Sequence, residues 1–159
     1  MTTERDILNL LGRRYSVLSQ GNSVRYAYAE HVRSCASWAP RTADFVAMDM
    51  WPSQGLHLHG HEVKVSRSDW LTELRDPAKA EEFKQYMDRW WLVISDRAMV
   101  KPGELPDDWG LMALDKNGAL RTVRVAPVLT PAPMPKGMLA ALLRATARTA
   151  HREAARLVA

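Results

Sequence analysis

Residues 61–66, His-Glu-Val-Lys-Val-Ser, constrain the fold more than any other stretch of this sequence. In an extended strand the side chains alternate between two faces, so Val63 and Val65 lie on one face while Glu62 and Lys64 lie on the other. Burial of the two valines sets the register, because a shift by one residue would send both charges into the core. The pattern therefore predicts a strand that presents a carboxylate and an ammonium to a cleft or to solvent.

A second short strand is predicted upstream, over residues 43–48. The loop that follows it, Trp-Pro-Ser-Gln-Gly at 51–55, can return the chain as a neighbour of the first strand. That pairing brings Asp44 close to Glu62. Two carboxylates on adjacent strands suit Mg²⁺ or Mn²⁺, which use few protein ligands and keep several waters for a phosphate-bearing substrate. Lys64 can then hold or polarise the attacking water.

The order of these residues resembles a known family. Asp44 followed by Glu62-x-Lys64 on a later strand is similar to the D…(D/E)-x-K signature of the PD-(D/E)xK nuclease superfamily, also called the restriction-endonuclease-like fold. The wider sequence resembles small stand-alone MmcB-like DNA-repair proteins over Arg-Thr-Ala-Asp at 41–44, Glu-Val-Lys-Val-Ser-Arg-Ser-Asp at 62–69 and Tyr-Met-Asp-Arg-Trp-Trp-Leu-Val at 86–93. Ala43 stands where the family name has proline.

The resemblance implies an α/β fold with a restriction-endonuclease-like core, a mixed sheet flanked by helices, and Mg²⁺- or Mn²⁺-dependent cleavage of DNA. It also implies that Asp44, Glu62 and the carbonyl of Val63 hold the ion. Many members carry an upstream glutamate near the metal, so Glu30 is the predicted accessory ligand, with an ordinary surface glutamate as the alternative. A DNA-binding repair scaffold that cuts nothing is the alternative function, although a scaffold does not need Asp44, Glu62 and Lys64 together.

Three residues of the central segment are predicted to contact DNA. Arg41 can bind a phosphate beside the metal or pair with a local carboxylate. In the superfamily the helix after the E-x-K strand lines the active site, so Lys84 and Gln85 are secondary candidates; their alternative is a solvated helix face.

Excess positive charge gathers at the C-terminal end. The chain has a formal net charge of +4 and a pI near 9.5, which fits a polyanionic partner. Residues 127–135 are rich in proline and cannot be helical, whereas residues 136–159 are rich in alanine and predict one long helix. Arg144, Arg148 and Arg152, with Arg156 next, lie four residues apart and form a stripe that either follows nucleic acid or is solvated. The expected organisation is a nuclease-like domain over residues 1–126, a linker over 127–135 and a basic helix over 136–159.

Other patterns complete the expected topology. Thr3-x-x-Asp6 is a capping box that opens a first helix, predicted to extend to about residue 21. Residues 24–32 alternate as a strand does, with a helix as the alternative. Ser66-x-x-Asp69 opens the helix after the E-x-K strand. The apolar run at 90–94 predicts a buried strand, and Asp-Lys-Asn-Gly at 115–118 predicts a hairpin.

A zinc-binding module is a third interpretation, because His57, His59 and His61 alternate along one segment. These histidines share the parity of Val63 and Val65 rather than that of the charged pair, so a structural role is favoured. The single cysteine, Cys35, excludes an internal disulfide and a cysteine-based zinc site.

Length and composition are those of one folded domain. The chain has 159 residues, of which 47% are hydrophobic and 25% charged. No apolar run approaches a membrane span, and the charged N-terminus is unlike a signal peptide. We therefore expect a cytoplasmic protein without a membrane partner, which binds DNA and for which a homodimer is also considered.

Overall fold

A mixed six-stranded sheet forms the centre of the computed structural model, which describes residues 1–18, 23–34 and 40–159. Its strands follow chain order: β1 (Tyr26–Arg33), β2 (Thr42–Asp49), β3 (Leu58–Lys64), β4 (Arg89–Ile94), β5 (Gly110–Leu114) and β6 (Leu120–Arg124). Strands β1, β2 and β3 pair antiparallel, β3, β4 and β5 pair parallel, and β6 returns antiparallel to β5. The expected α/β class and mixed sheet are confirmed.

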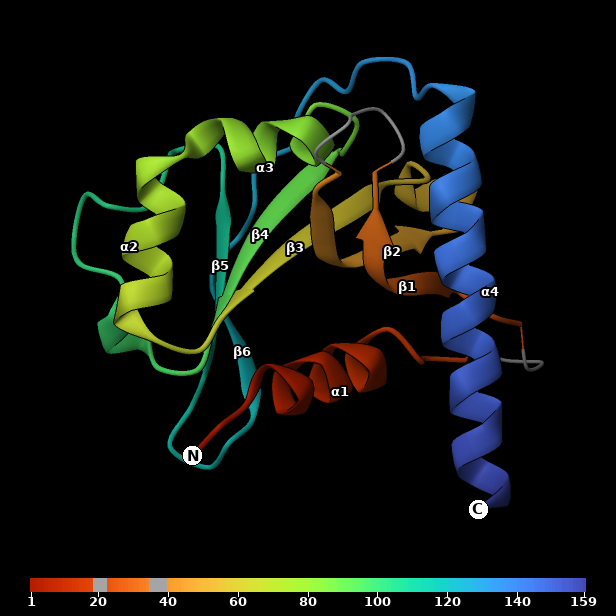
Figure 1. Ribbon diagram of the computed structural model, residues 1–159, viewed down its shortest axis with the longest axis horizontal. Coiled ribbons are helices and arrows are strands. Elements are labelled where there is room, and N and C mark those ends of the chain that lie inside the picture. The colour runs from red at the N-terminus through yellow and green to blue at the C-terminus, as the bar shows by residue number, and fades with distance from the viewer. Residues whose placement is uncertain (19–22, 35–39) are drawn as a thin grey trace.

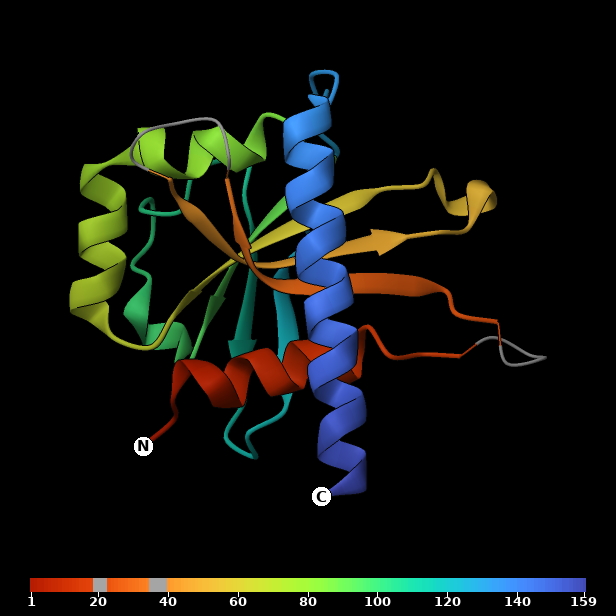
Figure 2. The same ribbon diagram turned by 45° about the vertical axis from the view of Figure 1, so that its right-hand side comes forward.

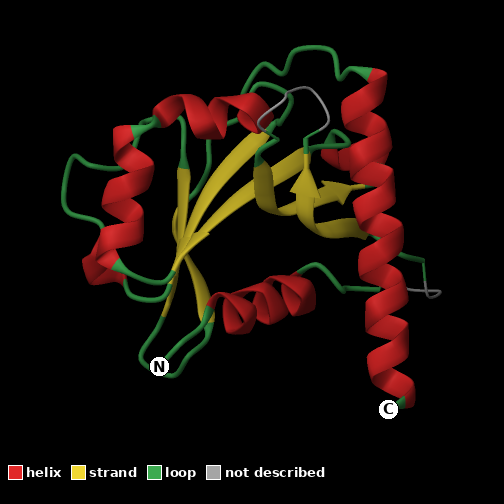
Figure 3. Ribbon diagram, viewed as in Figure 1, coloured by secondary structure: helices red, strands yellow, loops and turns green. Residues whose placement is uncertain are grey.

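Helices cover both faces of this sheet (Figures 1 and 3). They are α1 (Glu4–Arg14), α2 (Arg67–Arg75), α3 (Pro77–Lys84) and α4 (Lys136–Val158), with short 3-10 turns η1 (Pro52–Gln54) and η2 (Arg97–Met99). Apolar residues of α1 pack with Phe45, Val63 and Val93 on one face. Trp70 of α2 and Phe83 of α3 pack on the other face. None of the helices in the described part of the chain has the length and apolar character that crossing a membrane requires.

The alternation predicted for β3 is present. Val63 is 5% exposed and lies on the α1 face, paired in register with Val93. Glu62 pairs in register with Leu92 and Lys64 with Ile94, and both of these partners belong to the core beneath α2 and α3. The predicted exposure of Glu62 is wrong, however. Its carboxylate lies at a covered position, only 4% exposed, because α2 and α3 lie over it.

The predicted helix caps and the predicted hairpin turn are present in the structure. Thr3 forms the capping box of α1, and Ser66 caps α2 by accepting a hydrogen bond from the Asp69 N–H. The hairpin turns at Gly118, whose φ of 75° suits glycine. Helix α1 ends at Arg14, earlier than the repeat of leucines predicted. Cys35 lies outside the described residues.

Helix α4 lies alongside β1, as the two views in Figures 1 and 2 agree. Three of its residues join the same core cluster as Ala29 and Val32 of β1, namely Met138, Ala141 and Ala145. Residues 127–135 are non-helical, as predicted. The helix is therefore packed on the sheet rather than held apart by the linker.

Candidate metal centre

Asp44 and Glu62 face each other across β2 and β3. The antiparallel pair Phe45↔His61 places Asp44 opposite Glu62, because neighbouring positions in such a ladder step in opposite directions. The Asp44 Oδ2 accepts a hydrogen bond of 2.8 Å from the Val63 N–H. The two carboxylates therefore meet where β3 approaches its C-terminal end.

The main-chain carbonyl of Val63 points toward the same neighbouring strand, β2, as the Val63 N–H that Asp44 accepts. The Lys64 carbonyl accepts a hydrogen bond of 3.3 Å from the Ser95 N–H, next to the end of β4, so it points toward β4. In an extended strand the N–H and C=O of one residue point to the same side, and successive residues alternate. The Val63 carbonyl therefore points toward β2 and Asp44, where it can complete an oxygen donor set with Asp44 and Glu62.

Helix α2 adds a third carboxylate, that of Glu73, and helix α3 adds a second ammonium, that of Lys79. The Lys64 Nζ lies 2.5 Å from Glu62 Oε1 and 3.2 Å from Glu73 Oε2. The Lys79 Nζ lies 2.9 Å from Glu73 Oε2 and 3.4 Å from Glu62 Oε1. Sequence reasoning missed Glu73, although its place three residues after the buried Trp70 puts both on one helix face toward the sheet. The residue of α3 that contacts these carboxylates is Lys79, rather than the predicted Lys84 or Gln85.

Burial and mutual repulsion raise the pKa values of Asp44 and Glu62. The pKa of Glu62 is raised to about 7, mainly by burial and then by the Asp44 carboxylate, while Lys64 opposes both. Burial also raises the pKa of Asp44, against the hydrogen bond from Val63. Burial alone would lower the pKa of Lys64, but the Glu62 carboxylate outweighs it and raises that pKa, so Lys64 remains an ammonium. A divalent cation between Asp44 and Glu62 would favour their ionised forms, so this donor set fits Mg²⁺ or Mn²⁺.

An open cavity of about 370 Å³ reaches Lys64, Glu73 and Lys79 of this cluster, whereas Asp44 and Glu62 are not among its lining residues. Its walls come from α1, β3, α2 and α3, with Glu4, Val63, Lys64, Val65, Asp69, Thr72, Glu73 and Lys79 as lining residues. The Oε1 of Glu73 is buried and has no hydrogen-bond partner in the described part of the chain. The cavity can therefore admit ordered water or a phosphate oxygen beside Lys64 and Glu73.

A histidine reaches Asp44 from the neighbouring strand. One ligand atom each of Glu4, His31 and Asp44 lies within 4.8 Å of the others. The predicted accessory ligand, Glu30, is elsewhere: its buried carboxylate pairs with Arg5 at 2.6 Å and with Arg152. The next residue, His31, has a φ of 52°, an uncommon conformation outside glycine that no sequence pattern here announced.

Comparison with known proteins shows a likeness in fold. No protein-family model matches this sequence, and no curated protein matches it significantly. A solved structure described as SPO1766 protein of unknown function from Silicibacter pomeroyi is similar, with a TM-score of 0.54 and 22% sequence identity over 84% of this chain and 80% of that chain. At this identity the likeness supports the fold alone.

Most residues predicted to contact DNA are engaged within the chain. The Arg41 guanidinium lies 3.7 Å from the Asp76 carboxylate and 3.5 Å from the Glu82 carboxylate. This agrees with the alternative prediction that Arg41 pairs with a local carboxylate. Lys84 pairs with Asp108 and with Glu81. The Gln85 side chain donates to the Glu82 carbonyl, although the residue is exposed.

The arginine stripe of α4 is divided between two roles. Arg148 donates to the main-chain carbonyls of Glu30 and His31, and Arg152 pairs with the Glu30 carboxylate. Arg144 is exposed. Part of the stripe therefore braces β1 rather than projecting toward a partner.

The histidine triplet is built into the packing. His61 is fully buried and lies 2.9 Å from the Tyr15 hydroxyl. His59 stacks on Trp91 and accepts its indole N–H at 3.2 Å, and burial lowers the pKa of His59 to about 4. Among the residues that the structure describes, the triplet forms no cluster of ligand atoms.

Glu62→Gln should stabilise the metal-free protein at pH 8. The folded-state pKa of Glu62 lies above its ordinary value of 4.5, so the folded state binds its proton more tightly and stability falls as the pH rises from about 4.5 to about 7. Glutamine removes this penalty, worth about 1 to 3 kcal/mol at pH 8 and less toward pH 5. Chemical denaturation in chelator at both pH values measures the difference, with the exposed Glu81→Gln as control. A variant less stable than wild type at pH 8 would contradict the electrostatic assignment.

Proposed function

We propose that this protein is a metal-dependent nuclease that hydrolyses DNA phosphodiester bonds on a restriction-endonuclease-like core. The observation that carries the proposal is the meeting of Asp44, Glu62 and Lys64 at one end of adjacent strands, beside the carbonyl of Val63. These are the residues on which the resemblance to PD-(D/E)xK nucleases rests. The helices that follow β3 cover the same residues, as that resemblance implies, and β4 then runs parallel to β3.

Asp44, Glu62 and the Val63 carbonyl would hold Mg²⁺ or Mn²⁺, which when bound supplies stabilisation of the charge that develops on the phosphate. Because the pKa of Lys64 is raised, its ammonium acts as a hydrogen-bond donor that orients the attacking water or a phosphate oxygen. Glu73 positions that ammonium from α2, with Nζ 3.2 Å from its carboxylate. Lys79 adds positive charge beside Glu62 and Glu73 and lies partly open to solvent.

A digestion assay tests this proposal directly. Labelled linear duplex, nicked, branched and single-stranded DNAs are incubated with the purified full chain in Mg²⁺, in Mn²⁺ and in excess chelator. We expect cleavage of at least one DNA in the presence of metal and none in chelator. DNA binding without cleavage under all these conditions would favour the repair scaffold, and neither binding nor cleavage would reject both functions.

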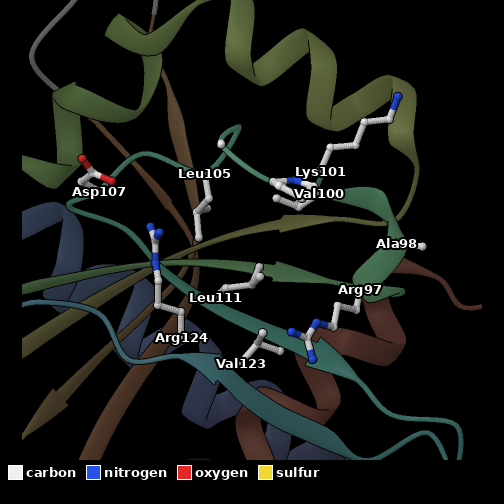
Figure 4. A pocket seen from close by; sticks show the side chains of 11 residues that line it. Arg97, Ala98, Val100, Lys101, Leu105, Asp107, Leu111, Val123 and Arg124 are labelled. Atoms are coloured by element: carbon white, nitrogen blue, oxygen red, sulfur yellow. The ribbon is translucent and has the colours of Figure 1, made fainter.

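A larger cavity than the one beside Lys64 offers a surface for the DNA backbone (Figure 4). It measures about 900 Å³ and lies beside η2, β5 and β6, with Leu111 and Val123 on its floor. Arg97 points over this floor, whereas the amino group of Lys101 points outward. Both residues are exposed, and neither forms a salt bridge with another described residue. Arg97 follows closely after Ile94, which pairs in register with Lys64, so the Arg97 side of the cavity lies at the same end of the parallel strands as the carboxylates. The other side of the cavity is lined by Leu111, near the start of β5, and by its partner Arg124.

The double variant Arg97→Gln, Lys101→Gln should bind DNA more weakly and with a weaker salt dependence. Each lost phosphate contact lowers the slope of log affinity against log salt by about 0.9 on duplex DNA. Affinities measured by fluorescence anisotropy at several salt concentrations give the slope for wild type and variant. The control is Lys116→Gln, in the exposed hairpin turn. Equal slopes for the double variant and the control would exclude this cavity as the DNA surface.

A further inference from the structure

We infer that a cavity at the C-terminal end of α1 binds an unpaired nucleobase together with its phosphate. This inference rests on the proposed function and deepens it, because it assigns the kind of DNA that the protein holds, a strand with at least one unpaired nucleotide. The cavity measures about 330 Å³ and shares no lining residue with the two cavities described above. Its aromatic and polar lining residues are Arg14, Tyr15, Arg25, Tyr26, His59 and Trp91.

Four aromatic side chains line this cavity. The rings of Tyr15 and Tyr26 meet edge to face, with centroids 5.1 Å apart and 76° between their planes. The rings of His59 and Trp91 are nearly parallel, with 10° between their planes and centroids 6.4 Å apart. Tyr15 and Trp91 are each only 5% exposed, so packing holds both rings in place. Rings fixed in this way give a flat apolar wall on which a base can stack.

His59 offers an uncharged hydrogen-bond donor. The Trp91 indole N–H can only donate, and it donates to the His59 Nδ1 at 3.2 Å. The ring proton of His59 is therefore on Nε2, and the ring is neutral at neutral pH because burial lowers its pKa to about 4. No second hydrogen bond joins this ring to a residue that the structure describes. A neutral donor suits the ring nitrogens and carbonyl oxygens of a base.

Two arginines give the cavity positive charge, and none of its described lining residues is acidic. Arg14 is exposed; its guanidinium donates to the Thr122 hydroxyl at 3.2 Å and forms no salt bridge with a described residue. Arg25, by contrast, pairs with Asp49 at 2.7 Å and lies over the Tyr26 ring, 4.9 Å from its centroid. Arg14 can therefore neutralise a phosphate, whereas Arg25 is held as part of the wall.

This combination of groups selects the ligand. Fixed rings, a neutral donor and a guanidinium without an acidic partner match a flat heterocycle that carries acceptor atoms and an adjoining anion, as an unpaired nucleotide does. A base inside a duplex cannot enter, because it is stacked and paired. The cavity beside η2 differs, since none of its described lining residues is aromatic. That cavity suits backbone phosphates, and the one at the end of α1 suits a base.

Helix α1 connects this cavity with the proposed cleavage site (Figure 1). Glu4, its first residue, lines the cavity beside Lys64, and Arg14, its last residue, lines this one. A rise of 1.5 Å per residue puts these two ends about 15 Å apart. Strand β3 gives a similar separation between His59 and Lys64, at about 3.3 Å per residue. About four or five stacked nucleotides cover this distance, so a strand with a phosphate beside Lys64 can reach the cavity.

The test uses the full chain in excess chelator, where the proposed cleavage cannot occur. Dye-labelled single strand and blunt duplex of the same sequence give affinities by fluorescence anisotropy. A single strand that contains 2-aminopurine, and the free 2-aminopurine mononucleotide, report stacking through the loss of their fluorescence. Tyr26→Leu removes one ring, and Arg14→Gln removes the exposed guanidinium. The matched controls are Tyr28→Leu, the next half-buried tyrosine on the same face of β1, and Arg13→Gln, the exposed neighbour on α1.

Wild type and both controls are expected to quench 2-aminopurine in the single strand. Tyr26→Leu and Arg14→Gln should each bind the single strand about tenfold more weakly, because stacking and phosphate contacts are lost. Both should bind the duplex as wild type does. Quenching of the free mononucleotide as well would assign the affinity to a single nucleotide, and quenching of the strand alone would assign it to DNA; both results support the nucleobase site.

Three results would overturn this inference even if the protein cleaves DNA in Mg²⁺. They are equal single-strand affinities in wild type, Tyr26→Leu and Arg14→Gln, no quenching of either fluorescent ligand, and an equally large loss of affinity for the duplex. Single-strand binding that depends on these two residues, in a protein that cleaves nothing, would retain the nucleobase site and reject the nuclease. Circular dichroism shows whether each variant is folded, and Arg14→Gln changes only an exposed side chain, so it decides the test if Tyr26→Leu unfolds.

Discussion

Lys64→Met is expected to slow DNA cleavage by a factor of about 10² to 10⁴, and Glu62→Gln by at least as much. Lys64 supplies the ammonium beside the carboxylates, with its Nζ 2.5 Å from Glu62 and 3.2 Å from Glu73. Methionine keeps most of the side-chain length but donates no hydrogen bond to water or phosphate. Rates of cleavage at saturating DNA, with binding measured separately, show whether the loss lies in chemistry.

The matched control for this experiment is Lys116→Met, at an exposed turn far along the sequence from the carboxylates. It should cleave at the wild-type rate. All variants are purified in parallel, so that a contaminating nuclease would appear equally in each preparation. Turnover close to wild type in Lys64→Met would reject the assignment of Lys64, and the same result in Glu62→Gln would reject the metal centre.

Ca²⁺ is expected to support DNA binding but to abolish cleavage, a loss of at least about a hundredfold relative to Mg²⁺ or Mn²⁺. Asp44, Glu62 and the Val63 carbonyl offer few ligands on rigid strands, which suits the near-octahedral preference of Mg²⁺. Ca²⁺ is larger and takes more ligands in looser geometry, so the water and the phosphate would lie in poor alignment.

Cleavage and anisotropy are measured in the same buffers with each metal. Recovery of cleavage when Mn²⁺ is added to a Ca²⁺ reaction confirms that the protein remained intact. Efficient cleavage in Ca²⁺ alone, or in excess chelator, would mean that the carboxylates have another role.

Strand alternation and the return of the chain predicted correctly that Asp44 and Glu62 lie opposite each other, and the reason is physical. Val63 and Val65 leave one register for β3, and the return of the chain after β2 then brings Asp44 opposite Glu62. The register of β3 and its pairing with β2 depend on the two-residue alternation of side chains and on a short connecting loop, and both can be read from the sequence. The prediction failed for the burial of Glu62 because that depends on how α2 and α3 lie over β3.

Residues that come from other layers could not be placed in this way. His31, whose backbone has a positive φ, lies near Asp44, and Glu4 of the first turn of α1 lies near both. Glu73 could have been predicted to face the sheet, because it lies three residues after Trp70 on the same face of α2. Arg148 and Arg152 resembled a nucleic-acid surface in sequence, since a basic stripe looks the same whether its partner is phosphate or the edge of its own sheet.

Helix α4 also closes an exposed sheet edge. Strand β1 is a terminal strand, and such a strand invites pairing with another chain through its free N–H and C=O groups. Side chains of α4 occupy these groups: the Thr149 hydroxyl accepts from the Glu30 N–H at 3.0 Å, and Arg148 donates to two carbonyls. The helix thus substitutes for the missing neighbour with contacts that a second copy of β1 cannot displace without unpacking Ala141 and Ala145. Protection of this sheet edge and the backbone conformation at His31, beside Asp44, therefore depend on the same few residues of α4, and a substitution there would affect aggregation and the proposed metal site together.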